Sequence, residues 1–200
     1  KTMQQVRRII NDQEVCTNII YRLDTKGKIL SFEDACPIIH LNEEDARKKD
    51  KVIFNCTEYA EDKPSVNLKH YVDLADMLLI VHDLLIKQPV KFTDYKGTKN
   101  PNYETGYESR ILNISYVENL FKDAGGFAIN IKTGPGIGGD KGQVMPAKEG
   151  GPTKEIKMCV PTPAMRTAAA VIQNYYQAKT AAAMVVYWKQ LFMNKDATSY

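Results

Sequence analysis

Thr162-Pro-Ala-Met-Arg-Thr-Ala-Ala-Ala-Val-Ile-Gln-Asn-Tyr-Tyr176 opens the longest regular segment of this sequence. Thr162 suits the N-cap of a helix, and Pro163 suits the first helical position, where a missing N–H costs nothing. The alanine-rich chain continues in the same way to about Phe192. One approximate stripe contains Met165, Ile172, Tyr176, Ala183 and Tyr187. We therefore predict a C-terminal helix over residues 161–193. A helix of about 29 residues there would be roughly 43 Å long, which exceeds what one sheet can cover.

Within this helix, Ala181-Ala-Ala-Met-Val-Val-Tyr-Trp188 is the longest unbroken apolar run of the chain. It falls far short of the roughly 20 residues that span a bilayer, so we expect no membrane partner. A helix that is apolar on every face must be buried on every face. We therefore predict a homo-oligomer with a subunit interface around Met184, Tyr187 and Trp188.

The preceding chain reads as strands around one further helix. Strand-like stretches occupy residues 51–57, 110–117, 126–133 and 154–160. Asp73 can cap a helix that runs to Lys87 before Gln88-Pro89 ends it, and its apolar residues extend beyond one face, which predicts packing on two sides. The predicted fold class is α+β, an antiparallel sheet with a central helix and a long C-terminal helix, plus a small N-terminal hairpin unit.

The first fifty residues form that appended unit in this interpretation. Met3 to Val15 has a weak helical stripe, and strands at 18–23 and 28–32 flank Asp24-Thr-Lys-Gly27, which reads as a hairpin turn. Residues 42–50 are a charged run that is either a short capped helix or a linker. We predict an N-terminal helix and hairpin over 1–50 and a main domain over 51–200.

Composition and charge narrow the function. The 200 residues are 44% hydrophobic and 26% charged, as in average globular chains, which excludes collagen-like, mucin-like and wholly disordered proteins. Nothing at the start of the sequence suggests secretion, so we expect a cytoplasmic protein. Residues 126–200 carry 9 Lys and Arg against 4 Asp and Glu, which makes them the first place to look for an anionic partner, although a solvated basic face is equally compatible.

Neither a metal site nor a cofactor site is predicted. Cys16, Cys36, Cys56 and Cys159 form no CxxC pair, and the three histidines form no HExxH motif. Gly134-Pro-Gly-Ile-Gly-Gly139 matches the GxGxxG pattern after a strand, but a poor helix former follows it, and no Walker A lysine is in place. We favour a flexible hairpin connection over 134–142 rather than a nucleotide-binding loop, and we find no convincing catalytic constellation.

Residues 90–108 are rich in turn formers, which indicates a long loop. The stretch from Lys91 to Arg110 interleaves aromatic and basic residues. Proteins that bind single-stranded nucleic acid use this mixture, with rings that stack on bases and cations that follow phosphates. Alternatively, the tyrosines fasten a long loop to the domain surface. The candidate binding residues from this stretch and from the last strands are Lys91, Phe92, Tyr95, Lys96, Lys99, Tyr103, Tyr107, Arg110, Lys132, Lys141, Lys154 and Lys157.

Two resemblances accompany this interpretation. The run from Asp62 to His70, through Phe92-Thr-Asp-Tyr-Lys-Gly97, to Gly134-Pro-Gly136 resembles small uncharacterised proteins of phages and conjugative elements of Gram-positive bacteria. Separately, the order of strands, helix, strands and long terminal helix is similar to the Whirly and PC4-like single-stranded DNA-binding architecture. That similarity implies oligomers whose sheets bind DNA.

Our leading hypothesis is a non-catalytic, oligomeric protein that binds single-stranded nucleic acid, most readily DNA. The second is a structural or assembly protein of a phage or mobile element that self-associates through its C-terminal helix. The third is an enzyme whose glycine loop covers a phosphate ligand.

Overall fold

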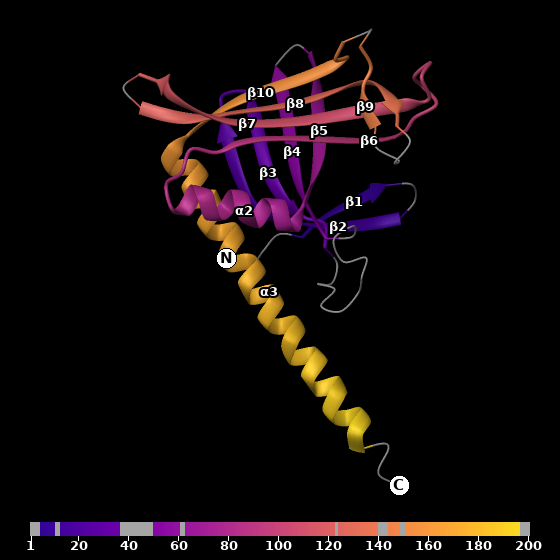
Figure 1. The fold of residues 1–200 in the computed structure, drawn as a ribbon, viewed down its shortest axis with the longest axis vertical. Coiled ribbons are helices and arrows are strands. Elements are labelled where there is room, and N and C mark those ends of the chain that lie inside the picture. Colours follow the sequence, from indigo (N-terminus) through magenta and orange to yellow (C-terminus); the bar gives the residue numbers. More distant parts are fainter. Residues whose placement is uncertain are drawn as a thin grey trace.

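The computed structural model describes residues 5–10, 13–36, 50–60, 63–122, 124–139, 144–148 and 151–196. Two antiparallel sheets and two helices make up this part of the chain (Figure 1). The predicted fold class is confirmed: the protein is α+β, with a helix between two sets of strands and a long helix at the end. The sheet prediction was incomplete, because the strands divide between two sheets.

Sheet A contains the first five strands in chain order. They are β1 (Gln5–Ile10), β2 (Gln13–Thr25), β3 (Lys28–Asp34), β4 (Lys51–Ala60) and β5 (Lys63–Asp73). Gly27 has φ 76° and turns the predicted hairpin between β2 and β3, which is confirmed. β3 then pairs with β4, so the N-terminal hairpin shares a sheet with strands of the predicted main domain.

The helix expected over residues 3–15 is wrong. Residues 5–10 and 13–25 are strands that pair with each other, and β2 continues into the hairpin. Sheet pairing therefore overrides the weak helical stripe, as tertiary context commonly does. The charged run 42–50 lies outside the described residues apart from Asp50.

Sheet B contains the later strands in the order β10-β8-β7-β6, and a short β9 pairs with β8. The strands are β6 (Lys91–Lys99), β7 (Tyr107–Phe121), β8 (Ala124–Gly138), β9 (Val144–Pro146) and β10 (Lys154–Pro161). The predicted strands at 110–117, 126–133 and 154–160 are confirmed. The loop expected over 90–108 is largely wrong, because residues 91–99 pair with β7 along their whole length.

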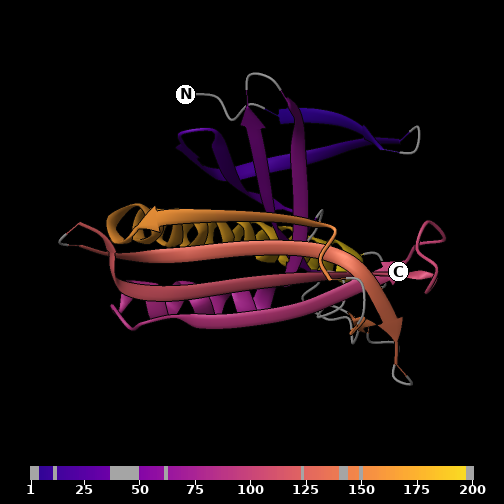
Figure 2. The same ribbon diagram turned by 90° about the horizontal axis from the view of Figure 1, so that it is seen from above.

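The strands of sheet A run across those of sheet B (Figures 1 and 2). Contacts of β5 with four strands of sheet B, namely β6, β7, β8 and β10, join the two. Alternating residues supply a continuous core between the sheets and the helices, including Phe32, Phe54, Leu112, Ile129 and Met158. Phe32 and Phe54 meet edge to face, with ring centroids 4.9 Å apart. Sheet B thus buries one face and leaves its other face uncovered, whereas residues 30–34 of β3 and 52–56 of β4 are buried on both faces of sheet A.

The central helix, α2 (Leu74–Leu85), begins directly after β5. Asp73 occupies the predicted N-cap position but makes no side-chain cap hydrogen bond, because its carboxylate accepts hydrogen bonds from Lys51 and Lys96. Met77, Ile80, Val81 and Leu84 are buried. Other apolar residues of the segment are exposed within the chain, Leu79 at 61% and Ile86 at 52%. The expectation that this helix packs on two sides is therefore wrong for the single chain.

The long helix, α3 (Thr162–Asp196), confirms the predicted C-terminal helix. Its first half packs against α2 and both sheets, and buries Met165, Ala168, Ala169, Ile172 and Tyr176 at helical spacing. Its second half projects away from the body of the molecule (Figure 1). No helix among the described residues is both long enough and apolar enough to cross a membrane.

Asp34, at the end of β3, holds α3 where it leaves the body. Its side chain is 2% exposed. The carboxylate accepts hydrogen bonds from the Tyr175 hydroxyl at 2.6 Å and the Tyr176 hydroxyl at 3.1 Å, and it pairs with the Lys179 ammonium. Burial and the charge of Asp34 raise the pKa of Tyr176, which therefore stays a hydrogen-bond donor. One carboxylate thus joins sheet A to the helix.

A second buried polar contact joins the two sheets. His70 of β5 is fully buried, and its Nε2 lies 3.0 Å from Oδ2 of Asp94 on β6. Its Nδ1 is buried without a hydrogen-bond partner. This geometry fits a neutral ring that donates from Nε2, because a proton on Nδ1 would have no acceptor. Burial lowers the pKa of His70, against the opposing influence of Asp94 and in the same direction as the charges of Arg110 and Lys96.

We expect Asp34→Asn to lower the free energy of unfolding by about 3–5 kcal/mol, the usual cost of removing one partner of a buried ion pair. Urea denaturation followed by circular dichroism measures the change. Asp24→Asn is the matched control, because Asp24 pairs with Arg22 at 2.7 Å on the surface and such pairs contribute at most about 1 kcal/mol. Equal losses in the two variants would contradict the anchoring role of Asp34.

We expect acidification to destabilise the fold through His70. Since burial lowers its pKa in the folded state, the unfolded chain binds more protons once the pH falls below about 6.5. The free energy of unfolding should then fall by up to about 1.4 kcal/mol per pH unit. Asp94, whose pKa is lowered despite its burial by the hydrogen bond from His70 and by Lys96, acts only near and below its ordinary value of 3.8.

Urea titrations between pH 5 and 7.5 separate the contribution of His70 from the rest. His70→Gln should flatten the pH dependence in this window, while His82→Gln, at an exposed position of α2, should leave it unchanged. An unaltered slope in His70→Gln would show that other groups cause the dependence.

Candidate nucleic-acid interface

The uncovered side of sheet B, called the outer face here, is a regular array of side chains. Figure 2 looks onto this sheet, with α2 and α3 behind it. Residues that alternate with the buried ones point outward, so the strand register places them in rows. The central rows are Lys91–Ser115–Ala128–Cys159, Thr93–Asn113–Asn130–Lys157 and Tyr95–Ile111–Lys132–Glu155.

Polar contacts between neighbouring strands organise the outer face. The Thr93 hydroxyl donates to the Asn113 amide oxygen at 2.9 Å. Asn130 donates through Nδ2 to Glu155 at 2.8 Å. Such cross-strand pairs stabilise a sheet and hold its surface side chains in place. The face is therefore preorganised before any partner binds.

Cations outnumber anions on these rows. Lys91, Lys132 and Lys157 stand against Glu155 alone. The Glu155 carboxylate lies 3.1 Å from Lys132 Nζ and 3.4 Å from Lys157 Nζ. The hydrogen bond from Asn130 and the two lysines hold the pKa of Glu155 below its ordinary value, so it stays ionised and is a weak base. Tyr95, 47% exposed, gives the face a ring.

Four of the twelve predicted binding residues meet on this face: Lys91, Tyr95, Lys132 and Lys157. Lys99 ends β6 beside Tyr107 of β7, on an extension of the same surface. Lys154 is exposed at the start of β10, opposite Thr133. Lys141 lies outside the described residues.

The structure places the other predicted residues elsewhere. Phe92 packs against the core, and Lys96 donates to Asp73 at 2.7 Å. The Arg110 guanidinium lies 5.7 Å from the centre of the Tyr71 ring, toward sheet A. In the turn after β6, the Tyr103 hydroxyl lies 3.1 Å from Thr153 Oγ1. The interleaved stretch thus contributes side chains to both faces of sheet B and to the turn between β6 and β7.

Sequence reasoning missed five polar residues of the outer face, namely Thr93, Asn113, Ser115, Asn130 and Glu155. The strand period is only partly visible, because two polar residues, Thr93 and Asp94, stand side by side and break the alternation along 91–96. The turn formers around this segment concealed it. The partners of Thr93 across the sheet could be found only from the strand register.

The glycines after Lys132 have a structural role. Residues 134–138 belong to β8, so the flexible connection expected over 134–142 is wrong for this part. A Cβ on Gly136 would lie 2.5 Å from Cγ1 of Val144, and one on Gly97 only 2.3 Å from Cβ of Val144. These glycines let β9 lie close against the sheet. Among the described residues that follow, β9 and β10 come before any helix, so this segment lacks the helix N-terminus that holds a phosphate.

Of the described free cysteines, two are buried and one is exposed. Burial raises the pKa of the Cys36 and Cys56 thiols to about 12, so both remain protonated. Cys159 is exposed on the outer face. Within the described ranges, no three His, Cys, Asp or Glu side chains gather as metal ligands would.

Comparison with known proteins adds little. No family model and no curated protein matches the chain. The structure is similar to the crystal structure of the Whirly protein WHY1 from Arabidopsis thaliana, with a TM-score of 0.44 and 7% sequence identity over 90% of this chain and 93% of that one. A similarity at these values assigns neither a family nor a function to this chain.

Proposed function

We propose that the protein binds single-stranded nucleic acid on the outer face of sheet B, without catalysing a reaction, and that it acts as a homo-oligomer. The observation that carries the proposal is that three lysines and Tyr95 share one uncovered, preorganised face of the sheet. Lysines track a phosphate backbone, and an exposed ring stacks on bases without regard to sequence.

An unpaired strand suits this face better than a duplex does. Reading a duplex requires a helix or a ribbon that enters a groove, whereas flat sheets with exposed aromatic residues stack splayed bases. Tyr95, Ile111 and the stem of Lys132 form one row across three strands, which offers such a platform. Single-stranded DNA and RNA both offer the phosphates and bases that these contacts need, and DNA is the ligand that we propose.

A binding role without catalysis also fits the chemistry of the face. Its rows contain no histidine, and their one carboxylate, Glu155, has a lowered pKa. General bases work best with a pKa near the operating pH, and Glu155 has been moved in the opposite direction.

Self-association is proposed through the second half of α3. Met184, Tyr187 and Trp188 are 48%, 38% and 56% exposed in the single chain, and Phe192 is 62% exposed. A groove of about 580 Å³ between α2 and α3, lined by Leu78 and Met184 among others, continues this apolar surface. Apolar patches of this kind mark protein interfaces, and a second copy presents a matching helix.

The same surface supports the alternative function, a structural or assembly protein, and the resemblance to proteins of phages and mobile elements belongs with it. That alternative requires association through α3 and no affinity for nucleic acid. Binding measurements on the purified full chain therefore decide between the two functions.

We expect binding to a single-stranded oligonucleotide to weaken steeply with salt, because each neutralised phosphate releases counterions. Substituting Lys91, Lys132 and Lys157 together by Gln should reduce the slope of log K against log salt by about 2, at about 0.7 per phosphate contact. Fluorescence anisotropy with a labelled oligonucleotide measures both slopes.

The matched control replaces the exposed residues Lys26, Lys87 and Lys122 by Gln, which changes the net charge equally away from the outer face. Equal slopes in the two triple variants would disprove this location of the site. Failure of the wild type to bind any oligonucleotide at low salt would disprove the function.

We expect Trp188→Glu to dissociate the oligomer, because it places a charge on a surface that association would bury. Light scattering after size-exclusion chromatography reports the mass. Asn174→Glu, at an exposed polar position of the same helix, should keep the wild-type mass. A Trp188→Glu variant with the wild-type mass and melting temperature would overturn the proposal, as would a wild-type monomer with a fully solvated Trp188.

A further inference from the structure

Four side chains of the outer face form a square on two paired strands. Asn130 and Lys132 stand two positions apart on β8, and Lys157 and Glu155 are their partners on β10. Residues two apart on a strand point to the same side, so all four lie on the outer face. The square therefore brings together one amide, one carboxylate and two of the three lysines that are proposed to bind phosphates.

The other three members of the square converge on one oxygen of the carboxylate. Asn130 donates through Nδ2 to Glu155 Oε1 at 2.8 Å. The Nζ atoms of Lys132 and Lys157 lie 3.1 Å and 3.4 Å from the same oxygen. The square is thus a formed anion site, and the protein's own side chain occupies it.

The Asn130 amide is turned toward this anion. Its Nδ2 faces Glu155, while its Oδ1 is buried without a hydrogen-bond partner. The reverse orientation would place the amide oxygen against the carboxylate, where the two would repel each other. Since an unsatisfied buried oxygen costs free energy, an amide held in this orientation indicates that the site prefers a negative charge.

A phosphate of a single strand fits the same donors. The unesterified oxygens of a phosphodiester share one negative charge, as the oxygens of a carboxylate do. Lysines bind phosphate as point charges, and an amide N–H adds a directed hydrogen bond. Ion pairs between exposed side chains are weak, and the side chains of Lys157 and Glu155 are 68% and 30% exposed. A phosphate can therefore replace the carboxylate, which then turns into solvent.

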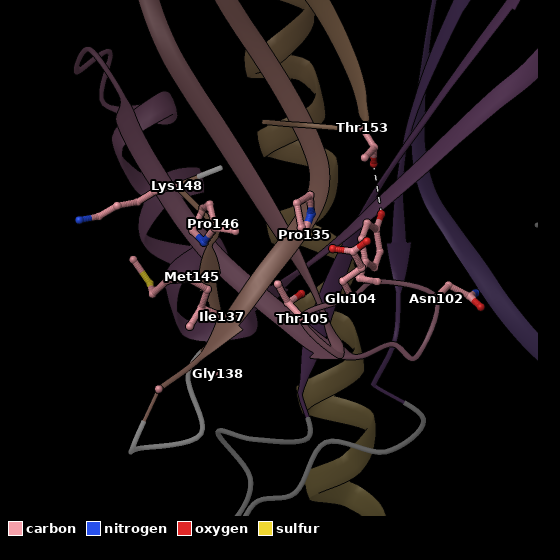
Figure 3. Close-up of a pocket in the computed structure, with 13 residues that line it drawn as sticks. Asn102, Glu104, Thr105, Pro135, Ile137, Gly138, Met145, Pro146, Lys148 and Thr153 are labelled. Carbon is pink, nitrogen blue, oxygen red and sulfur yellow. Dashed lines mark hydrogen bonds between the residues drawn. The ribbon is translucent and has the colours of Figure 1, made fainter. Parts of the chain in front are cut away.

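A pocket of about 1000 Å³ at the end of the same sheet does not gather donors in this way. Its described lining contains one lysine, Lys148, and one glutamate, Glu104. Figure 3 shows the Lys148 side chain pointing away from the other labelled residues, so its ammonium does not meet a second donor there. The square is therefore the better site for a phosphate.

We propose that Asn130, Lys132 and Lys157 together bind one backbone phosphate of the single strand, and that Glu155 occupies this phosphate site until the strand displaces it. The inference rests on the proposed function and adds to it a binding residue, Asn130, and an internal competitor, Glu155. Tyr95 lies in the row of Glu155, three strand spacings or roughly 14 Å across the sheet. The phosphate site and the ring therefore contact different parts of the strand.

Glu155→Gln should raise the affinity for oligo(dT) about fivefold, since it removes two exposed ion pairs that compete with the phosphate. The new side chain can still accept the hydrogen bond from Asn130. Fluorescence anisotropy at 0.15 M salt measures the affinity, and circular dichroism checks that each variant is folded.

The matched control is Glu118→Gln, which also removes one exposed carboxylate from the sheet. Glu118 lies roughly 23 Å along β7 from Ile111, the residue of that strand in the row of Glu155. This distance exceeds the Debye length of about 8 Å, so the affinity should change less than about twofold.

Asn130→Ala tests the convergence of donors without a change of charge. In the Glu155→Gln background it should weaken binding about fivefold, because the phosphate loses one hydrogen bond. Asn119→Ala in the same background removes an exposed amide near the end of β7 and should leave the affinity unchanged.

Three outcomes would contradict these expectations. Equal affinities of Glu155→Gln and Glu118→Gln would overturn the inference and leave the proposed function standing. A gain in Glu155→Gln that Asn130→Ala does not reduce would assign the effect to charge alone, and would overturn the three-donor phosphate site. Failure of the wild type to bind oligo(dT) at low salt would overturn both the inference and the function.

Discussion

The buried carboxylate of Asp34 fixes the position of the long helix α3 relative to sheet A. Two tyrosine hydroxyls and one ammonium of α3 converge on it, from residues 175, 176 and 179. A charge in a nearly inaccessible position is tolerated only when it is paired and hydrogen-bonded. The helix is thus held to sheet A up to Lys179, and the remainder projects beyond the body (Figure 1).

This arrangement separates the two surfaces that the proposed function uses, the outer face of sheet B and the projecting half of α3. The inner face of sheet B is covered by sheet A and the helices, which leaves its outer face uncovered. The projecting half of α3 lies on the opposite side of the sheet (Figures 1 and 2). Association through α3 would therefore leave every outer face open, and an oligomer would present several binding faces to one strand. Linked sites raise the overall affinity without new contacts.

The polar residues between the two sheets hold the sheets against each other. Asp94 and Lys96, which the sequence places beside Tyr95, point to the inner side of β6, where they meet His70 and Asp73. Their hydrogen bonds and ion pairs join the two sheets. The residues proposed to bind nucleic acid on the outer face are their neighbours one residue away, because successive side chains of a strand point to opposite faces.

Local pattern was enough to predict the fold class. The alternation in residues 110–117, 126–133 and 154–160, the Gly27 turn and the helix starting at Thr162 each have local signals, and each element formed where it was expected. The Thr162 hydroxyl, expected to cap the helix, instead donates to the Gly125 carbonyl. The same reasoning failed at Met3–Val15 and at 90–108. In both places the conformation is set by pairing with another strand, and no local pattern records that pairing.

Periodicity and charge, which are local properties of the chain, were enough to predict both described helices, many of the strands and the residues that could bind an anion. Which of those residues share a surface could be learned only from the packing of distant segments. Lys91 and Lys157 are far apart in the chain and lie on one face, while Tyr95 and Lys96 are adjacent and lie on opposite faces. A binding face depends on strand register and on sheet packing, and both depend on contacts between distant segments of the chain.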